Sequence, residues 1–384
     1  MKDGIINVYK PKSMTSNDVI YKVRAALGIK KLGHTGTLDP MAEGVLPILI
    51  NRGTRIAEYL DWDLKTYVST VRLGIRTDSL DITGAVEKIS DPSGVTETDV
   101  ANAFCELFRD GSADLAENVF SGVLDQIPPM TSAVRINGRR LYEYVHQGEE
   151  IPDEIRQKIR PRRVWVENLK IEDISLPEIT FSVTCSKGTY IRSISRDIGE
   201  ILGCGAVMTS LERSASGAFN EGNAVSLDEF VKAAVMTGKV TVEDTSVMRL
   251  RRTEPFGDEI PEELEKYVLG VDFPLVNFGE ALVSPENARR FLVGWHLGYN
   301  EIKIIRKPAE NSWIMALGHE AETYHMRETE INSGSHAGLK LHPEYFTMYR
   351  IYRDDGGGAR TFVGIARHSD KYHKLVPDKV FLRI

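Results

Sequence analysis

The segment that most constrains how this chain can fold is a short turn that leads straight into an apolar strand. Residues 33–40 read GHTGTLDP, and VLPILI follows at residues 45–50. Paired glycines and a proline predict a tight turn, and the apolar run predicts a buried strand. Asp39 stands before the proline, where the backbone is restricted to extended or turn conformations. Because a carboxylate is costly to place against a buried strand, Asp39 is a candidate for a functional role.

Length and composition indicate a globular protein with two domains. The chain has 384 residues, 42% of them hydrophobic, which is more than one ordinary core accommodates. No basic segment followed by a long apolar stretch opens the chain, and no later stretch has membrane-spanning length, so we expect a cytoplasmic protein. The three cysteines are Cys105, Cys185 and Cys204; their odd number and wide spacing support neither a disulfide framework nor a zinc ribbon.

Charge is unevenly distributed along the chain. The formal net charge of −7 argues on average against a polyanionic partner. Residues 1–60 nevertheless hold nine Lys and Arg against five Asp and Glu, and residues 156–163 hold five basic side chains and no acidic one. These local surpluses could bind phosphates, or they could be ordinary solvated surface.

Hydrophobic periodicity predicts a mixed α/β first half. A helix is expected over residues 16–27, with Ser16 as its N-cap and Gly28 beyond its end. Alternation predicts strands over residues 66–73, with Tyr67 on the apolar face, and over residues 179–185. A second helix is expected from Ile191 to Leu202, which places Tyr190 and Arg192 at a strand-to-helix junction that favours an anion.

The second half is less regular. Residues 241–270 lose periodicity and are rich in Glu, Asp and Pro, which is typical of a linker with some short helix. Residues 347–352 and 360–366 flank DDGGG and predict a β-hairpin. We therefore expect a small, strand-rich carboxyl-terminal domain.

Two segments resemble known functional motifs without matching them. Residues 28–35 nearly spell a phosphate-binding loop, but His34 stands where the lysine is needed, and a helix precedes the loop. His319 and His325 are six residues apart, so they cannot share one helix face as zinc-protease ligands do.

The turn at residues 33–40 resembles the signature of the TruB family of tRNA pseudouridine synthases. Further resemblances follow in family order through residues 5–228, at NVYKPKSMTS, KTY, QIPPMTSA, GRRLY, KGTYIRS and LER. The chain departs from the family pattern at Arg135, where a lysine is usual, and at Glu212, where an arginine is usual. Arg135 keeps the charge with a different geometry, and Glu212 removes one expected RNA contact.

The resemblance implies a fold and a domain order. It implies an α/β (α+β) pseudouridine synthase fold, with a mixed, largely antiparallel twisted sheet and a small β-rich PUA-like domain. We expect the catalytic domain at residues 1–244 with an RNA-gripping insertion at about 121–165, a linker at 245–270, and the PUA-like domain at 271–384 with an insertion at 301–345.

The resemblance also implies the chemistry. The chain would isomerise the uridine at position 55 in the T-loop of tRNA, as a monomer and without metal or organic cofactor. Asp39 matches the catalytic aspartate; attack at ribose C1′, attack at base C6 and removal of a ribose proton are all open to it. Arg192 would pair with Asp39, or bind phosphate alone. Tyr67 would stack on the uracil or transfer a proton, unless it is only a core residue.

The remaining expected contacts concern the RNA. His34 would fill the space that the flipped base vacates, or be an ordinary turn histidine. Tyr190 and Leu211 would line the pocket. Phosphate or substrate contacts are expected from Lys10, Arg135, Arg139 and Arg140.

Two other functions remain compatible with the residues. One is a noncatalytic RNA-binding protein or tRNA folding chaperone on the same scaffold, although binding alone has no use for an acid beside RNA. The other is a hydrolase that releases free uracil. Formation of pseudouridine in an unmodified tRNA transcript distinguishes the enzyme from both.

Overall fold

The computed structural model describes residues 3–61, 63–146, 152–244, 249–254, 260–309, 348–369 and 373–382. The chain divides into two compact units. The larger unit comprises Ile6–Ile48 and Asp61–Tyr267, and the smaller unit comprises Met1–Ile5, Leu49–Leu60 and Val268–Ile384.

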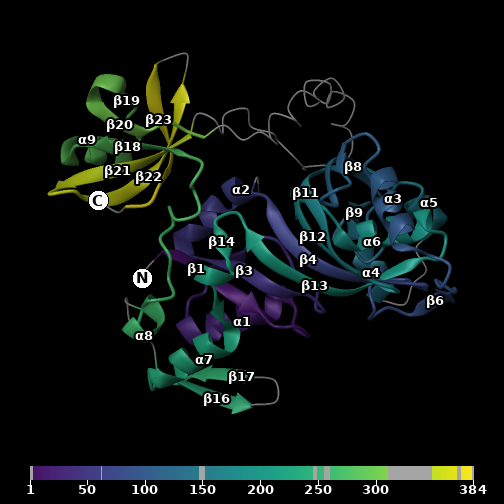
Figure 1. The fold of residues 1–384 in the computed structure, drawn as a ribbon. Coiled ribbons are helices and arrows are strands. Elements are labelled where there is room, and N and C mark those ends of the chain that lie inside the picture. The colour runs from purple at the N-terminus through teal and green to yellow at the C-terminus, as the bar shows by residue number, and fades with distance from the viewer. Residues whose placement is uncertain are drawn as a thin grey trace. The chain divides into compact units, whose positions relative to one another are not determined.

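The larger unit is built on a mixed sheet for which 11 strands are described (Figure 1). Nine of them follow the order β15-β1-β3-β13-β4-β12-β11-β8-β7, while β2 pairs with β3 and β14 with β13. The pairs β1–β15 and β13–β3 are parallel. Along the run β13-β4-β12-β11-β8-β7 every neighbouring pair is antiparallel. The strands are β1 Gly4–Lys10, β2 Leu32–His34, β3 Glu43–Ile50, β4 Lys65–Leu73, β7 Ser112–Asp114, β8 Val119–Gln126, β11 Arg162–Ser175, β12 Glu178–Cys185, β13 Ala206–Ser216, β14 Phe219–Asn220 and β15 Val225–Ser226. The expected mixed, largely antiparallel sheet is confirmed.

Helices lie at both ends of this sheet. Figure 1 shows α3 and α6 near one end and α1 and α7 near the other. Their bounds are α1 Ser16–Leu27, α3 Glu97–Leu107, α6 Ile191–Ile201 and α7 Leu227–Met236. The larger unit also contains a short strand pair, β5 Ile75–Thr77 with β6 Val86–Ile89.

The N-cap of the first helix lies one residue before the expected position. Thr15, not the expected Ser16, is the N-cap, and it forms a capping box with Asp18. The helix ends at Gly28, whose φ of 67° is left-handed, as expected. The Ser16 hydroxyl instead bonds both main-chain groups of Leu38, at 2.9 Å to its nitrogen and 3.2 Å to its oxygen. The helix start therefore holds the residue that precedes Asp39.

The expected RNA-gripping insertion is narrower than residues 121–165. Its two ends belong to β8 and β11, which pair with each other in the main sheet. Between them lie β9 Arg135–Ile136, β10 Arg139–Arg140, α4 Leu141–His146 and α5 Asp153–Arg156. These elements have a small core of their own, formed by Val134, Ile136, Leu141 and Ile155. We call the segment from Ile127 to Pro161 the insertion below.

The expected linker contains regular structure. The strand β17, Arg249–Arg252, pairs antiparallel with β16, Val240–Asp244, and both belong to the larger unit. A short helix, α8 Glu262–Glu265, follows. Main-chain pairing produced this hairpin in a segment whose side chains show no clear alternation.

The smaller unit is rich in strands, as expected. Its sheet has the order β19-β23-β22-β21-β18-β20, and α9 packs against its core. The elements are η1 Asn51–Ile56, α2 Ala57–Leu60, β18 Gly279–Val283, α9 Pro285–Leu292, β19 Leu297–Gly298, β20 Ile302–Arg306, β21 Met348–Gly356, β22 Ala359–Ser369 and β23 Lys374–Val380. The expected hairpin is β21 and β22.

Part of the insertion expected at residues 301–345 belongs to the sheet of the smaller unit. Residues 302–306 form β20, which pairs with β18 and so belongs to the sheet. Residues 310–347, including His319 and His325, lie outside the described residues.

Three further observations concern the residues that the structure describes. None of their helices is both long and apolar enough to cross a membrane. No three of their His, Cys, Asp or Glu side chains are grouped so as to hold a metal ion. The three cysteines are all free thiols.

Candidate active site

Asp39 lies in the turn between β2 and β3, where the sequence predicted a tight bend. Gly36 in this turn has a φ of 78°, which favours glycine, and Leu38 is buried in the core. The side chain of Asp39 remains 33% exposed. A substrate can therefore reach the carboxylate of Asp39, whose position in the chain is fixed by the turn at Gly36 and the burial of Leu38.

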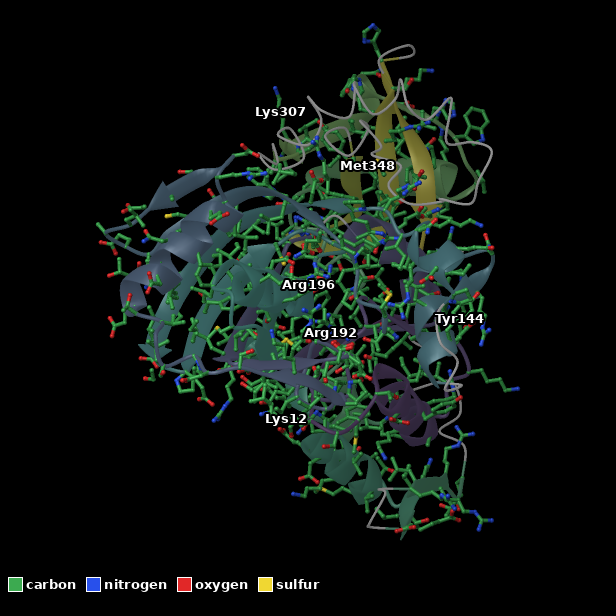
Figure 2. All side chains as sticks on the ribbon, turned by 90° about the vertical axis from the view of Figure 1, so that its right-hand side faces the viewer. Lys12, Tyr144, Arg192, Arg196, Lys307 and Met348 are labelled. Atoms are coloured by element: carbon green, nitrogen blue, oxygen red, sulfur yellow. The ribbon has the colours of Figure 1, made fainter. Side chains whose placement is uncertain are left out.

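Arg192, on the first turn of α6, meets this carboxylate. Its Nε lies 3.0 Å from Oδ2 of Asp39, and its Nη2 donates to Oδ1 at 3.3 Å. The two contacts form a fork that fixes both the position and the orientation of the carboxylate. Figure 2 labels Arg192, together with Arg196 one turn further along the helix. The structure thus brings together the two residues that the family resemblance paired.

Further contacts hold the Arg192 guanidinium. Its Nη1 donates to the main-chain oxygen of Ser79 at 3.0 Å and to the hydroxyl of Thr131. The same nitrogen lies 3.8 Å from Oδ2 of Asp81. Arg192 therefore joins α6, the insertion and the loop after β5 at one point.

Asp81 was not predicted from the sequence as a site residue. This carboxylate is buried and accepts hydrogen bonds from Ser79 and from the main chain and hydroxyl of Thr83. The signal was present, because DSLDITG at residues 78–84 has the Asp, Ser and Thr density of side-chain-capped turns. The site holds two carboxylates around one guanidinium rather than a single acid with its partner.

Opposing influences act on the acid. Burial raises the pKa of Asp39 above its ordinary value, and the nearby Asp81 charge raises it further. The Arg192 guanidinium and the Lys10 ammonium lower it, without cancelling the effect of burial. Arg192 is therefore the main stabiliser of the ionised form of Asp39.

Tyr67 and Leu211 lie in the same core cluster as Leu38. Tyr67 is on β4 and faces the core, and Arg213 on β13 is its partner in the sheet register. Burial raises the pKa of Tyr67 above its ordinary value, and the Arg213 guanidinium opposes this. Tyr67 is therefore a neutral phenol at neutral pH, beside a positive charge.

Arg213 is fully buried, and its hydrogen bonds hold the turn from the side of the sheet. Its Nε donates to the main-chain oxygen of Val45 at 2.8 Å, and its Nη2 donates to that of Gly36 at 3.2 Å. No hydrogen-bond partner for its Nη1 is found among the described residues. The sequence placed Arg213 in a family motif but gave it no role.

His34 is half-buried on β2. Burial lowers the pKa of His34, and the Arg213 charge adds to this effect. The imidazole is therefore neutral at pH 7. Its Nδ1 is buried and has no hydrogen-bond partner among the described residues, which leaves a polar atom for a ligand to satisfy.

Lys10 does not lie where a phosphate could reach it. The side chain is fully buried, and its Nζ donates to the main-chain oxygens of Pro11, Met14 and Pro40 at 2.9, 2.6 and 3.4 Å. Burial lowers its pKa to about 8. The expected phosphate contact is therefore wrong for this structure, because three carbonyls occupy the ammonium, and Lys10 instead anchors the residue after Asp39.

The other expected contact residues belong to the insertion or pack against it. Tyr190 is the N-cap of α6 and packs against the insertion core. Its main-chain nitrogen and oxygen both bond the side-chain amide of Gln126. Arg139 lies over the ring of Tyr144 at 3.9 Å, and Arg140 donates to the hydroxyl of Tyr142 at 2.8 Å. Arg135 is exposed.

Family models match most of this site. The model of the TruB family pseudouridylate synthase N-terminal domain matches residues 24–191, and that of the tRNA pseudouridylate synthase B C-terminal domain matches residues 192–275. The tRNA pseudouridine synthase B of Clostridium kluyveri is 37% identical over 294 residues, which are 76% of this chain and 84% of that protein. That of Geotalea uraniireducens is 44% identical over 230 residues, 60% of this chain and 68% of that protein.

Solved structures share the fold. The chain superposes on one in a Cbf5-Nop10-Gar1 complex with a TM-score of 0.60 at 21% identity, covering 99% of this chain and 85% of that one. A chain of an H/ACA RNP bound to a substrate RNA containing 2′-deoxyuridine gives a TM-score of 0.60 at 19% identity, with the same coverage. The expected pseudouridine synthase fold is confirmed. By its domain matches and its relatives, the chain belongs to the TruB family of pseudouridine synthases, isomerases that act on uridine in tRNA.

Proposed function

We propose that the chain isomerises the uridine at position 55 in the tRNA T-loop, with Asp39 as its catalytic carboxylate. The observation that carries this proposal is the forked contact between Asp39 and Arg192. It supports an ionised acid that is held in one orientation and still one-third exposed. A carboxylate placed only for stability needs no such access.

The reaction conserves all atoms of the substrate. The bond between ribose C1′ and uracil N1 breaks, a bond between C1′ and C5 forms, and the proton on C5 is lost while N1 gains one. Because no water is consumed, the second catalytic carboxylate of a glycosidase is not needed. Asp39 acts at the reacting nucleotide, and Asp81, behind Arg192, helps to position that guanidinium.

The uridine has to leave its stack to reach Asp39, which costs a few kcal/mol. Stacking on an aromatic ring returns about 1–3 kcal/mol per base, and Tyr67 supplies that ring. His34 takes the space that the base vacates, as a neutral imidazole with an unsatisfied Nδ1. Tyr190 and Leu211 complete the lining of the pocket.

The insertion grips the T-arm. Arg135, Arg139 and Arg140 contact RNA phosphates, which positions the arm without reading its bases. Arg192 contacts Thr131 of the same insertion, which supports a link between RNA binding there and the geometry of the acid.

The test uses an unmodified tRNA transcript and a second transcript that carries cytidine at position 55. We expect one pseudouridine per molecule of the first transcript and none in the second. Modification of the second transcript at another uridine would overturn the proposed specificity. RNA binding without any pseudouridine would favour a folding chaperone, and release of free uracil would favour a hydrolase.

A further inference from the structure

A basic surface that the reaction itself does not use lies on the larger unit. It is formed by the end of α1, the turn after it, and the hairpin of β16 and β17. Figure 1 shows this hairpin beyond α7. Its exposed basic side chains are Lys30, Lys31, Arg249, Arg251 and Arg252. Five cations in this surface stand out in a chain whose formal net charge is −7.

Packing brings the hairpin and the helix together. The guanidinium of Arg252 covers Gly28 so closely that a Cβ there would lie 1.2 Å from its Nη1. Gly28 caps the carboxyl end of α1, where a cation is favoured by the unpaired carbonyls. Arg252 therefore fixes β17 beside α1 and leaves the opposite face of that strand, which carries Arg249 and Arg251, exposed.

Basic side chains outnumber acidic ones here: the five cations face three acids on or beside the hairpin, Glu243, Asp244 and Glu254, and Asp244 lies opposite Arg249 in the strand register. On the exposed face of the hairpin, Glu243 lies 3.4 Å from Arg251, whose side chain is 70% exposed. A pair so exposed contributes little and is easily exchanged for another anion. Tyr21, on the same stripe of α1 as Gly28, is 64% exposed, and Arg24 lies over its ring. Exposed aromatic rings among basic side chains are typical of nucleic-acid-binding surfaces.

The lysine turn lies close to the active-site turn along the chain. Lys31 is followed directly by β2, and His34 comes three residues later. Three residues span about 10 Å at most. An RNA whose uridine reaches Asp39 therefore has its flanking backbone within range of the lysine turn, and the hairpin extends the cationic surface further from the site.

We propose that this basic surface binds the phosphate backbone of the substrate tRNA outside the loop that holds the target uridine. The proposal rests on the proposed function only for the identity of the RNA. Arg249 and Arg251 contact phosphates without reading bases, and Lys30 and Lys31 connect that contact to the active site.

The test measures tRNA binding as a function of salt for the double variant Arg249→Gln, Arg251→Gln. Both side chains are exposed and neither packs in the core, so the variant is expected to fold. We expect affinity at low salt to fall at least about fivefold, and the slope of log affinity against log salt to decrease by about two. The double variant Lys30→Gln, Lys31→Gln should give a similar change.

Two single variants add an expected gain in tRNA binding and a control without change. Glu243→Gln removes the acid beside Arg251 and should tighten binding. Arg109→Gln, an exposed arginine beside Asp110, is the matched control and should leave binding unchanged. An unaltered salt slope in the hairpin variant, or an equal loss in the Arg109 control, would overturn the proposal. Because the readout is binding, a failure of the uridine 55 assignment would appear separately, as RNA bound but not modified.

Discussion

Two buried arginines hold the Asp39 turn, and they differ in what they bind. Arg192 on α6 lies between two carboxylates, Asp39 and Asp81. Arg213 on β13 donates instead to main-chain oxygens of the turn and of β3, and no partner for its Nη1 is found among the described residues. A buried charge is costly without a compensating anion. Arg192 has two such anions, whereas Arg213 donates to main-chain oxygens, so we infer that the two arginines have different roles.

We infer that Arg192 holds the catalytic acid in place, whereas Arg213 supplies a positive electrostatic potential. Arg192 orients the carboxylate and keeps it ionised, because its fork matches both oxygens. Arg213 leaves part of its charge uncompensated beside Tyr67, where it lowers the pKa of the phenol against the effect of burial. We expect this charge to stabilise negative charge that develops on the base or on Tyr67 during the reaction.

The largest effect is expected for Asp39→Asn, which removes the carboxylate that Arg192 holds. If the fork exists to present a carboxylate, its loss should reduce turnover about 10³-fold or more, whereas the affinity for tRNA should stay within about twofold. Single-turnover rates and equilibrium binding measure the two quantities. Glu43→Gln on β3, which removes an acid paired with Lys12, is the control and should keep full turnover. Substantial turnover in purified Asp39→Asn would refute the assignment.

Replacing each of the two arginines by lysine tests whether their roles differ. Lysine keeps the charge of arginine but loses the planar fork. Arg192→Lys should reduce turnover about 10²-fold, because the acid is displaced from its orientation. Arg213→Lys should reduce it less, about tenfold, because a point charge still supplies the potential. Equal losses, measured as single-turnover rate constants on one tRNA, would show that the two arginines do not differ in role.

The sequence could predict the parts of this arrangement that depend on local pattern. Alternation predicted β4 with Tyr67 on its core face, and the helical spacing of apolar residues from Ile191 onward predicted that Arg192 lies at the start of a helix. The turn of Asp39 was predicted from its glycines and proline. The fold class also followed from the family resemblance, because the motifs occur in family order over residues 5–228.

The contacts that need three-dimensional proximity could not be predicted. Asp81 and Arg192 are 111 residues apart, and only the loop after β5 brings them together. Lys10 looked like a phosphate ligand because lysine is usually exposed, whereas the carbonyls that bury it come from two separate segments. The hairpin of β16 and β17 was missed because its pairing depends on main-chain hydrogen bonds rather than on alternation.

The pH dependence of the reaction should also distinguish the two arginines. Asp39 acts as a carboxylate and has a raised pKa, so kcat/KM should fall on the acidic side at a pH above that of an ordinary aspartate. Arg192→Gln removes a charge that lowers this pKa, so the acidic limb should move to higher pH. Asp81→Asn removes a charge that raises it, so the limb should move to lower pH. Arg213→Lys should leave the limb in place, and a shift there as large as that of Arg192→Gln would contradict the division of roles.

The smallest expected effect concerns the hydrogen bond between Arg192 and Thr131 of the insertion. Thr131→Val keeps the shape of the side chain but removes the hydroxyl that accepts from Nη1 of Arg192, while the bond to Ser79 remains. Losing one such hydrogen bond is worth about 1 kcal/mol, so turnover at saturating tRNA should fall about fivefold, with little change in affinity. Thr131→Ser retains the hydroxyl and should restore the rate. A loss confined to affinity would mean that Thr131 serves RNA binding alone, and that the insertion does not act on the acid through Arg192.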